Sequence, residues 1–243
     1  MNILCIGNSF SQDATRYLRS IAKADGEKWN VVNLYIGGCP LYKHYINAME
    51  DQRAYSIQLD GEGIGFFASI KEALIHTDWD IVTVQQASPK SYDYDSYQPY
   101  LNYVVDYVRK YAPKVKIFVH QTWAYEEGSE RLALLGFEHM SDMFAEIEKA
   151  YRAAAKDICA DGLIPSGELL QNLVKSGVEK VHRDTFHAAW GVGRYAIALL
   201  WYALLGKKDI AENTFSEWDE PIPEEQVAIV KREVAALCRK YNP

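Results

Sequence analysis

Short runs of apolar, β-favouring residues recur along the chain, separated by longer segments in which apolar positions follow helical spacing. The short runs predict strands at residues 2–6, 29–35, 81–84, 116–121 and 162–165. Such an alternation is typical of βαβ units, in which a helix connects two parallel strands. The pattern therefore predicts an α/β fold built on a parallel sheet.

The longer segments with helical spacing have local signals at their ends. Proline at position 113 ends one helix, because the residue before a proline is disfavoured in the α conformation. Proline followed by two acidic residues opens the last helix, as the helix dipole prefers. The predicted helices span residues 13–23, 66–76, 97–111, 138–159, 167–175, 188–205 and 224–241.

Two long stretches, 37–65 and 87–96, lack either pattern and are rich in Tyr, Asp and Ser. We expect irregular loops there, and loops of this length inside a compact fold tend to be functional. The glycines at 61, 63 and 65 match neither GxGxxG nor GxxxxGK[ST], so a nucleotide-binding loop is not expected. No repeat, low-complexity tract or Ser/Gly linker interrupts the chain, which predicts one domain over residues 1–243.

Composition and charge exclude several classes of function. The chain has 243 residues, of which 49% are hydrophobic and 24% charged, as in an ordinary folded domain. A net charge of −7 without a basic cluster argues against nucleic acid as a partner. The apolar segment 190–205 is interrupted by Arg194 and is too short to span a bilayer, so no membrane partner is expected.

The start of the chain and its metal-binding residue types add two further expectations. The first predicted strand begins at the initial methionine, which predicts a cytoplasmic protein, or a secreted or periplasmic one if a signal peptide has been removed. The four cysteines are scattered along the chain, so we expect reduced thiols. Neither they nor the histidines show metal-ligand spacing, so no metal site is expected.

A first candidate for chemistry is the segment Ile6-Gly-Asn-Ser-Phe-Ser11, which follows the first predicted strand. Gly7 allows a tight turn there, which places Ser9 at or near a helix N-terminus. Unpaired N–H groups and the helix dipole at such a site favour negative charge on a nucleophile or a tetrahedral intermediate. Asn8, Ser9 and Ser11 would also be good helix caps, so the segment alone has a structural interpretation too.

A second candidate lies near the other end of the chain, where Asp184 and His187 are three residues apart just before a long apolar helix. This spacing lets a carboxylate reach Nδ1 of the imidazole while Nε2 points outward. Such a pair fixes the tautomer and makes the histidine a usable general base. Taken singly, Asp184 has an alternative role as a helix cap, with His187 an ordinary surface residue.

Together, the two segments resemble the first and last sequence blocks of the SGNH (GDSL-like) hydrolases, and the chain looks most similar to a bacterial branch with the sequence GNSF. Asn8 departs from the aspartate usual in the first block, whereas the serine is present. The resemblance implies a three-layer α/β/α, flavodoxin-like fold with a five-stranded parallel sheet of order 2-1-3-4-5. It also implies a Ser-His-Asp triad of Ser9, His187 and Asp184, and no cofactor.

The resemblance further implies an oxyanion hole. Gly38, or alternatively Gly37, matches the family's glycine block, where a backbone N–H approaches the substrate oxygen. The family's Gly-x-Asn-Asp block is absent, and the third strand ends instead in Gln85 and Gln86. A glutamine amide donates the same hydrogen bond as asparagine, so either residue is a candidate for the third donor.

The fourth strand leads to Gln121 and Trp123, which are candidates for substrate binding at the same edge of the sheet. Trp123 could stack on a sugar ring or could simply cover the core. We expect a serine esterase acting on a small acyl ester, an acetyl group on a carbohydrate by the resemblance. A lipid- or thioester-directed acylhydrolase and an inactive glycan-binding domain of the same fold are the alternatives; the oligomeric state is left open.

Overall fold

In the computed structural model, which describes residues 1–241, seven strands form one sheet in the order β4-β3-β2-β1-β5-β6-β7. Five of them run parallel, and β3 and β4 extend the sheet in antiparallel fashion beyond β2. The strands are β1 (Asn2–Gly7), β2 (Asn30–Tyr35), β3 (Tyr55–Leu59), β4 (Glu62–Ala68), β5 (Ile81–Val84), β6 (Lys116–His120) and β7 (Gly162–Ile164).

The parallel strands lie at the centre of the core. Ile3 of β1 pairs with Val31 of β2 on one side and with Ile81 of β5 on the other, and all three side chains are buried. Strands covered on both faces have sequences that are nearly continuous apolar runs, which is why the sequence predicts them well. The parallel strands follow the order β2-β1-β5-β6-β7, but the prediction of a sheet limited to five strands is wrong.

The two additional strands form a hairpin where the sequence predicted an irregular loop. Asp60 and Gly61 connect β3 to β4, and both have positive φ values, 53° and 76°. Asp-Gly with two positive φ angles is the preferred sequence of a tight hairpin turn. The glycine-rich stretch that follows is the edge strand β4, whose residues up to Phe67 are exposed.

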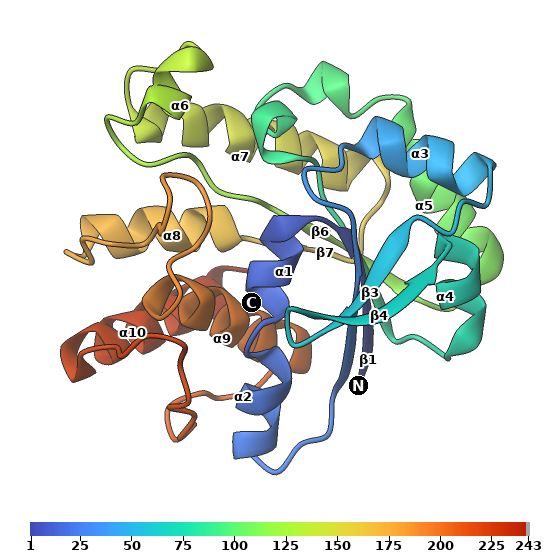
Figure 1. Ribbon diagram of the computed structural model, residues 1–243. Coiled ribbons are helices and arrows are strands. Elements are labelled where there is room, and N and C mark those ends of the chain that lie inside the picture. Colours follow the sequence, from blue (N-terminus) through green and yellow to red (C-terminus); the bar gives the residue numbers. More distant parts are fainter. Residues whose placement is uncertain (242–243) are drawn as a thin grey trace.

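Helices cover both faces of the sheet (Figure 1). On one face α9 packs against α1, α2, α8 and α10, on the other α5 packs against α3 and α4, and α7 lies on β6 and β7. The helices are α1 (Ser9–Thr15), α2 (Leu18–Ala24), α3 (Leu41–Met49), α4 (Ile70–His76), α5 (Tyr100–Tyr111), α6 (Glu130–Leu134), α7 (Met140–Asp157), α8 (Ser166–Lys175), α9 (Val192–Gly206) and α10 (Glu224–Tyr241), with short 3-10 turns at Ser88–Lys90 and Tyr94–Ser96.

Several helix boundaries differ from the predicted ones. The helix predicted at 13–23 is two helices, which separate at Arg16 and Tyr17. The helix predicted at 66–76 begins only at Ile70, because the side chain of Ser69 caps it by accepting a hydrogen bond from the N–H of Glu72. Helix α3 was not predicted. Helix α9 is buried from Val192 to Leu205, which explains why its sequence is apolar all round.

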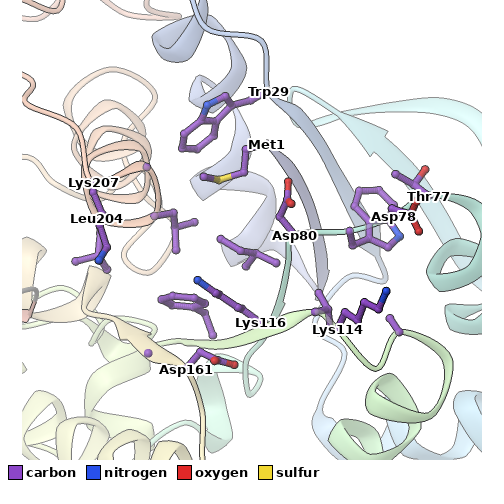
Figure 2. Close-up of a pocket in the computed structure, with 18 of the residues that line it drawn as sticks. Met1, Trp29, Thr77, Asp78, Asp80, Lys114, Lys116, Asp161, Leu204 and Lys207 are labelled. Carbon is purple, nitrogen blue, oxygen red and sulfur yellow. The ribbon is translucent and has the colours of Figure 1, made fainter.

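The carboxyl ends of the parallel strands lead to the segments that carry the candidate residues, as open α/β sheets usually do. A cavity of about 1090 Å³ lies instead at their amino ends, where Met1, Trp29, Asp80 and Lys116 line it (Figure 2). It includes none of the predicted site residues. Within residues 1–241 no helix is both long and apolar enough to cross a membrane.

Candidate active site

Ser9 is the first residue of α1, directly after the turn that leaves β1. Asn8 caps this helix: its side chain accepts a hydrogen bond from the N–H of Phe10 at 3.0 Å, and its own N–H donates to Ser11 Oγ at 3.0 Å. Gly7 is required for this close turn, because a Cβ there would lie 2.1 Å from Ser11 Oγ. The local sequence therefore fixes the backbone position from which the Ser9 side chain extends.

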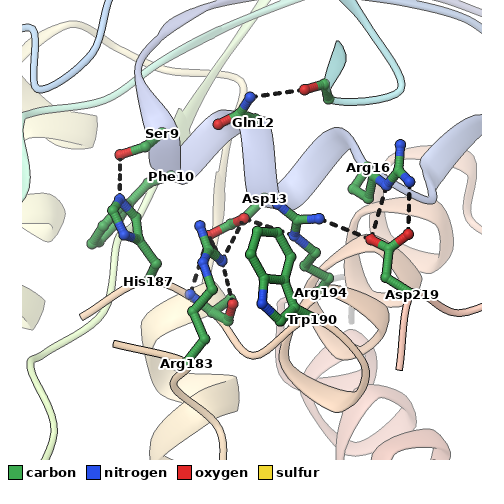
Figure 3. A network of polar contacts seen from close by, with 12 residues as sticks. Ser9, Phe10, Gln12, Asp13, Arg16, Arg183, His187, Trp190, Arg194 and Asp219 are labelled. Atoms are coloured by element: carbon green, nitrogen blue, oxygen red, sulfur yellow. Dashed lines mark hydrogen bonds and ion pairs between the residues drawn. The ribbon is translucent and has the colours of Figure 1, made fainter. Parts of the chain in front are cut away.

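The structure brings the two distant candidate segments together. Ser9 Oγ lies 2.8 Å from Nε2 of His187 (Figure 3). Nδ1 of the same ring lies 2.8 Å from Oδ2 of Asp184. An ionised carboxylate can only accept, so Nδ1 donates to Asp184 and Nε2 is left to accept the serine proton. The backbone N–H of His187 also donates to Asp184 Oδ1, at 2.9 Å, which fixes the carboxylate.

The electrostatics of Asp184 keep it ionised. Partial burial by itself would raise the pKa of its carboxyl group. Two hydrogen bonds from His187 and the charge of Arg183, whose Nε lies 4.0 Å away, outweigh burial, and the pKa lies below its usual value. A charged Asp184 is the form that stabilises an imidazolium on His187.

The loop that carries Asp184 and His187 has a strained backbone at Thr185. Its φ of 74° lies in the left-handed region, which β-branched residues rarely adopt. The Thr185 carbonyl accepts a hydrogen bond from the N–H of Glu126 at 2.7 Å, and the Phe186 carbonyl accepts one from Nε1 of Trp123 at 2.7 Å. These two hydrogen bonds from the segment after β6 thus stabilise the loop that carries Asp184 and His187.

Aromatic rings surround the imidazole. The Phe186 ring centroid lies 3.8 Å from that of His187, and Phe10 meets the imidazole edge-on at 5.9 Å. Trp123 stacks on Phe10 with centroids 4.1 Å apart. The prediction that Trp123 stacks on a substrate ring is wrong: its side chain is fully buried and its face is already covered by Phe10.

A buried carboxylate that the sequence analysis missed ties α1 to the histidine loop. Asp13, one helical turn beyond Ser9, is fully buried. Its oxygens accept hydrogen bonds from Arg183 (2.9 Å), from Nε of Arg194 (2.8 Å) and from the N–H of Ala188 (3.1 Å), as Figure 3 shows for the side chains. The residues before Asp184 and after His187 are therefore both anchored to the helix that carries the serine.

The same network continues outward from Arg194. Its Nη1 lies 2.9 Å from Asp219 Oδ2, and Asp219 also receives two hydrogen bonds from Arg16. The Trp190 ring lies 4.1 Å from the guanidinium carbon of Arg183 and 4.0 Å from that of Arg194. The interruption of an apolar helix by Arg194 was the available signal, because a buried arginine needs a carboxylate partner.

The predicted oxyanion residue Gly38 lies in the turn after β2, with a φ of 61°. The next residue, Cys39, is tied to the serine turn, because its carbonyl accepts a hydrogen bond from Asn8 Nδ2 at 3.3 Å. Within residues 1–241 neither the N–H of Ser9 nor that of Gly38 has a hydrogen-bond acceptor. Both N–H groups are free to bind a substrate oxygen.

Gln86 does not supply a third donor. Its Nε2 donates to the carbonyl and the hydroxyl of Ser96, at 3.0 and 3.1 Å, so both of its hydrogens are used. Its Oε1 accepts from the N–H groups of Leu41 and Ala87. The residue is fully buried and supports the start of α3 instead.

Gln85 is also buried, but it belongs to a chain of hydrogen bonds that ends next to Ser9. Its Nε2 donates to Asn8 Oδ1 at 2.8 Å, and its Oε1 lies 2.7 Å from Nδ1 of His120. Nε2 of His120 lies 3.0 Å from Ser166 Oγ, which Trp201 Nε1 approaches at 3.3 Å. Burial lowers the pKa of His120 to about 3, so the ring is neutral. A neutral ring can donate from Nδ1 to Gln85 and accept at Nε2 from Ser166. Gln85 thus orients Asn8, and its own side chain is almost fully buried.

Gln121 is likewise withdrawn from the surface. Its side chain is fully buried, and Oε1 accepts a hydrogen bond from the N–H of Glu168 at 3.1 Å. Its Nε2 has no partner within the described residues. The predicted contact of Gln121 with a substrate hydroxyl is therefore wrong, because no surface of this side chain is accessible.

Cys39 and His44 do not form a second catalytic pair. Sγ lies 3.6 Å from Nδ1, but burial raises the pKa of the Cys39 thiol to about 12 and lowers the pKa of His44 to about 3. Both groups are therefore neutral at pH 7. Within residues 1–241 no group of three or more His, Cys, Asp or Glu side chains is arranged to hold a metal ion.

Comparisons with known proteins show the family and the fold of the chain. Residues 2–235 match the family described as "Domain of unknown function (DUF4886)". A crystal structure of a DUF4886 family protein from Bacteroides uniformis is similar over 97% of this chain and 93% of that chain, with 32% sequence identity and a TM-score of 0.88. The comparison with curated proteins found no match.

More distant structures share the fold. One is described as a candidate SGNH hydrolase from Slackia heliotrinireducens (22% identity, TM-score 0.63, 85% of this chain and 99% of that chain). Another is the lipopolysaccharide acetyltransferase periplasmic domain of Salmonella ser. Paratyphi A (12% identity, TM-score 0.54, 85% and 82%). The resemblance to SGNH hydrolases inferred from two short segments is confirmed at the level of the fold.

Proposed function

The chain belongs to the family described as a domain of unknown function (DUF4886), and we propose that it is a serine esterase whose catalytic triad is Ser9, His187 and Asp184. One observation carries the proposal: the 2.8 Å contacts that join hydroxyl, imidazole and carboxylate in series, although Ser9 and His187 are 178 residues apart in sequence. Catalysis by such a triad requires this serial arrangement.

In the proposed mechanism Ser9 Oγ attacks the carbonyl carbon of an ester while Nε2 of His187 takes the serine proton. Asp184 stabilises the imidazolium. The imidazolium then gives its proton to the leaving alcohol, and the acyl group remains on Ser9. Water, deprotonated by His187, cleaves this acyl-enzyme and releases the acid.

The proposed oxyanion hole consists of the backbone N–H groups of Ser9 and Gly38. Both lack an acceptor within the described chain, and the hydrogen bond from Asn8 to the carbonyl of Cys39 ties the two turns together. With the glutamine side chains committed elsewhere, a two-donor hole is the arrangement that the described contacts support. Its donors need no rearrangement during the reaction, which is the property that makes such sites effective.

For the substrate we propose a small acyl group, acetyl in the first instance, on a carbohydrate. The triad reaches the surface, with the His187 side chain 17% and the Asp184 side chain 46% exposed, so a hydrophilic leaving group can remain in contact with water. An apolar groove of about 450 Å³, lined in part by Ile64 and Phe66, lies at β4. None of the triad residues lines it, so it cannot hold the acyl chain of an ester bound at Ser9. The fold is shared with a domain named for acetyl transfer to lipopolysaccharide.

Hydrolysis of p-nitrophenyl esters of increasing acyl length tests the proposal. We expect the highest kcat/KM for the acetyl ester, a steady decline with chain length, and no activity above background in Ser9→Ala. A preference for acyl groups of eight or more carbons would contradict the acetyl proposal and favour a lipid- or thioester-directed enzyme. A folded wild-type protein that hydrolyses none of the esters would favour a glycan-binding role.

A further inference from the structure

Arg131 is a cation at the active site without a carboxylate partner. It belongs to α6, is exposed, and forms no ion pair within residues 1–241. Its guanidinium carbon lies 4.2 Å from the ring centroid of Phe186, the residue that packs on the imidazole of His187. The charge thus lies on the aromatic residue that packs against the catalytic base.

The stack on Phe186 leaves the hydrogen-bonding edge of Arg131 available. The guanidinium carbon lies over the Phe186 ring, and the N–H groups of a guanidinium lie around its edge, where they can still donate. These donors have the spacing that a carboxylate accepts in a bidentate manner. Within the described chain no side chain uses them, so the position is suited to a negatively charged group from outside the protein.

Neutral hydrogen-bonding groups lie beside Arg131, and the acidic residues near it in sequence, Glu126, Glu127 and Glu130, form no ion pair with it. Tyr125 meets Phe186 edge-on with centroids 5.7 Å apart, and its hydroxyl lies 3.0 Å from Ser88 Oγ. Burial raises the pKa of Tyr125, and the nearby charge of Arg131 opposes this shift. The net charge of −7 would not attract an anion from a distance, so recognition of one must be local.

The reaction geometry says which part of a substrate would meet Arg131. His187 protonates the oxygen of the leaving alcohol, so that alcohol must lie beside the imidazole. Phe186 covers the imidazole, and Arg131 lies on Phe186. A group that reaches Arg131 therefore belongs to the leaving alcohol.

We propose that Arg131 binds a carboxylate on the leaving alcohol, so that the enzyme prefers esters of acidic alcohols such as acidic sugars over neutral ones. The inference rests on the proposed esterase function and specifies its substrate class. Arg131 acts here as a specificity-determining residue and takes no part in bond making or breaking.

Release of acetate from 4-acetoxybenzoate and from its neutral methyl ester tests the proposal, since methylation removes the charge of the leaving alcohol, and the intrinsic reactivities of the two esters are the same for every variant. The ratio of their kcat/KM values measures charge preference. We expect Arg131→Gln to lower this ratio about tenfold, chiefly by raising KM for the acid, and added salt to lower it in the wild type. Arg131→Lys should keep part of the preference, because it keeps the charge but loses the planar fork.

Arg232→Gln is the matched control, because it removes the same charge from an exposed ion pair on α10 and should leave the ratio unchanged. Equal loss of activity toward both substrates in Arg131→Gln would overturn the proposal and leave Arg131 a packing role on Phe186. A wild-type enzyme active on both substrates with a ratio insensitive to Arg131→Gln would also overturn it. Failure of the wild type to hydrolyse either substrate would instead contradict the esterase function on which the inference rests.

Discussion

Asp13 and Arg183 form a buried ion pair in which both carboxylate oxygens lie 2.9 Å from Nη1 of the guanidinium. The pair joins the helix that begins with Ser9 to the residue before Asp184. Because Asp13 also accepts hydrogen bonds from Arg194 and from the N–H of Ala188, one carboxylate anchors the histidine loop on both sides of Asp184 and His187. Asp13 is thus a positioning residue for the proposed triad.

Asp13→Asn should therefore destabilise the protein strongly and weaken catalysis. Removing one partner of a buried ion pair leaves charges without compensation, which costs about 3–5 kcal/mol. Urea unfolding measures this loss, and in the fraction that stays folded kcat should fall more than KM rises. Glu148→Gln, which breaks the exposed pair with Arg152, should cost less than about 1 kcal/mol. Equal effects of the two substitutions would contradict the role assigned to Asp13.

Asp184→Asn should lower kcat by about 10³–10⁴-fold with little change in KM. An amide in place of the carboxylate can no longer stabilise the imidazolium, and its NH₂ group favours the wrong tautomer of His187. Steady-state hydrolysis of p-nitrophenyl acetate measures the effect. A loss smaller than tenfold would show that the contact between Asp184 and His187 has no catalytic role.

Gly38→Ala should lower kcat/KM by about 10²-fold, because the N–H group of a displaced turn no longer meets the developing oxyanion. Gly26→Ala is the matched control: both glycines have positive φ, 61° and 72°, and a Cβ at either would meet nothing within 4 Å. Both substitutions should therefore cost about 1–2 kcal/mol in stability. Only the change at Gly38 should affect the rate; equal rates for the two variants would remove Gly38 from the oxyanion hole.

Stability should fall as the pH is lowered from about 6.5 toward 4. Burial lowers the pKa of His44 and His120 to about 3 and that of His182 to about 4, whereas in the unfolded chain each histidine has its ordinary value of 6.5. The unfolded state thus binds more protons in this range, and each histidine contributes a slope of about 1.4 kcal/mol per pH unit.

His120→Gln isolates one of these contributions. The pH dependence of its free energy of unfolding, measured with urea between pH 4 and 6.5, should be shallower than that of the wild type by about one proton. Identical slopes would show that His120 is protonated in the folded protein, and the hydrogen-bond chain from Trp201 to Asn8 would then need a different arrangement.

Sequence patterns predicted the parallel core well for a physical reason: strands buried on both faces must be apolar throughout. The β3–β4 hairpin was missed because β4 is an exposed edge strand with two glycines and no alternating pattern. The Asp60-Gly61 pair was the signal that could have found it, since both residues adopt positive φ in the turn.

The sequence predicted those parts of the candidate site in which the interacting residues lie within one short segment. The spacing of Asp184 and His187 and the turn at Ser9 follow from short segments. The roles of Trp123, Gln121 and Gln86 do not, because sequence cannot tell whether a polar or aromatic side chain at a strand end faces the substrate or the core. Asp13 was missed for the same reason, since a buried aspartate and an exposed one look alike in a short helix.

Fluorophosphonate labelling followed by mass spectrometry of the labelled peptide tests whether Ser9 is the nucleophile. A single adduct should form on Ser9, be absent in Ser9→Ala, and form far more slowly in His187→Gln, with all three proteins folded by circular dichroism. Ser11, two residues away but hydrogen-bonded to Asn33, should stay unmodified. A folded wild-type protein that takes up no probe, or takes it up on a serine other than Ser9, would contradict the account.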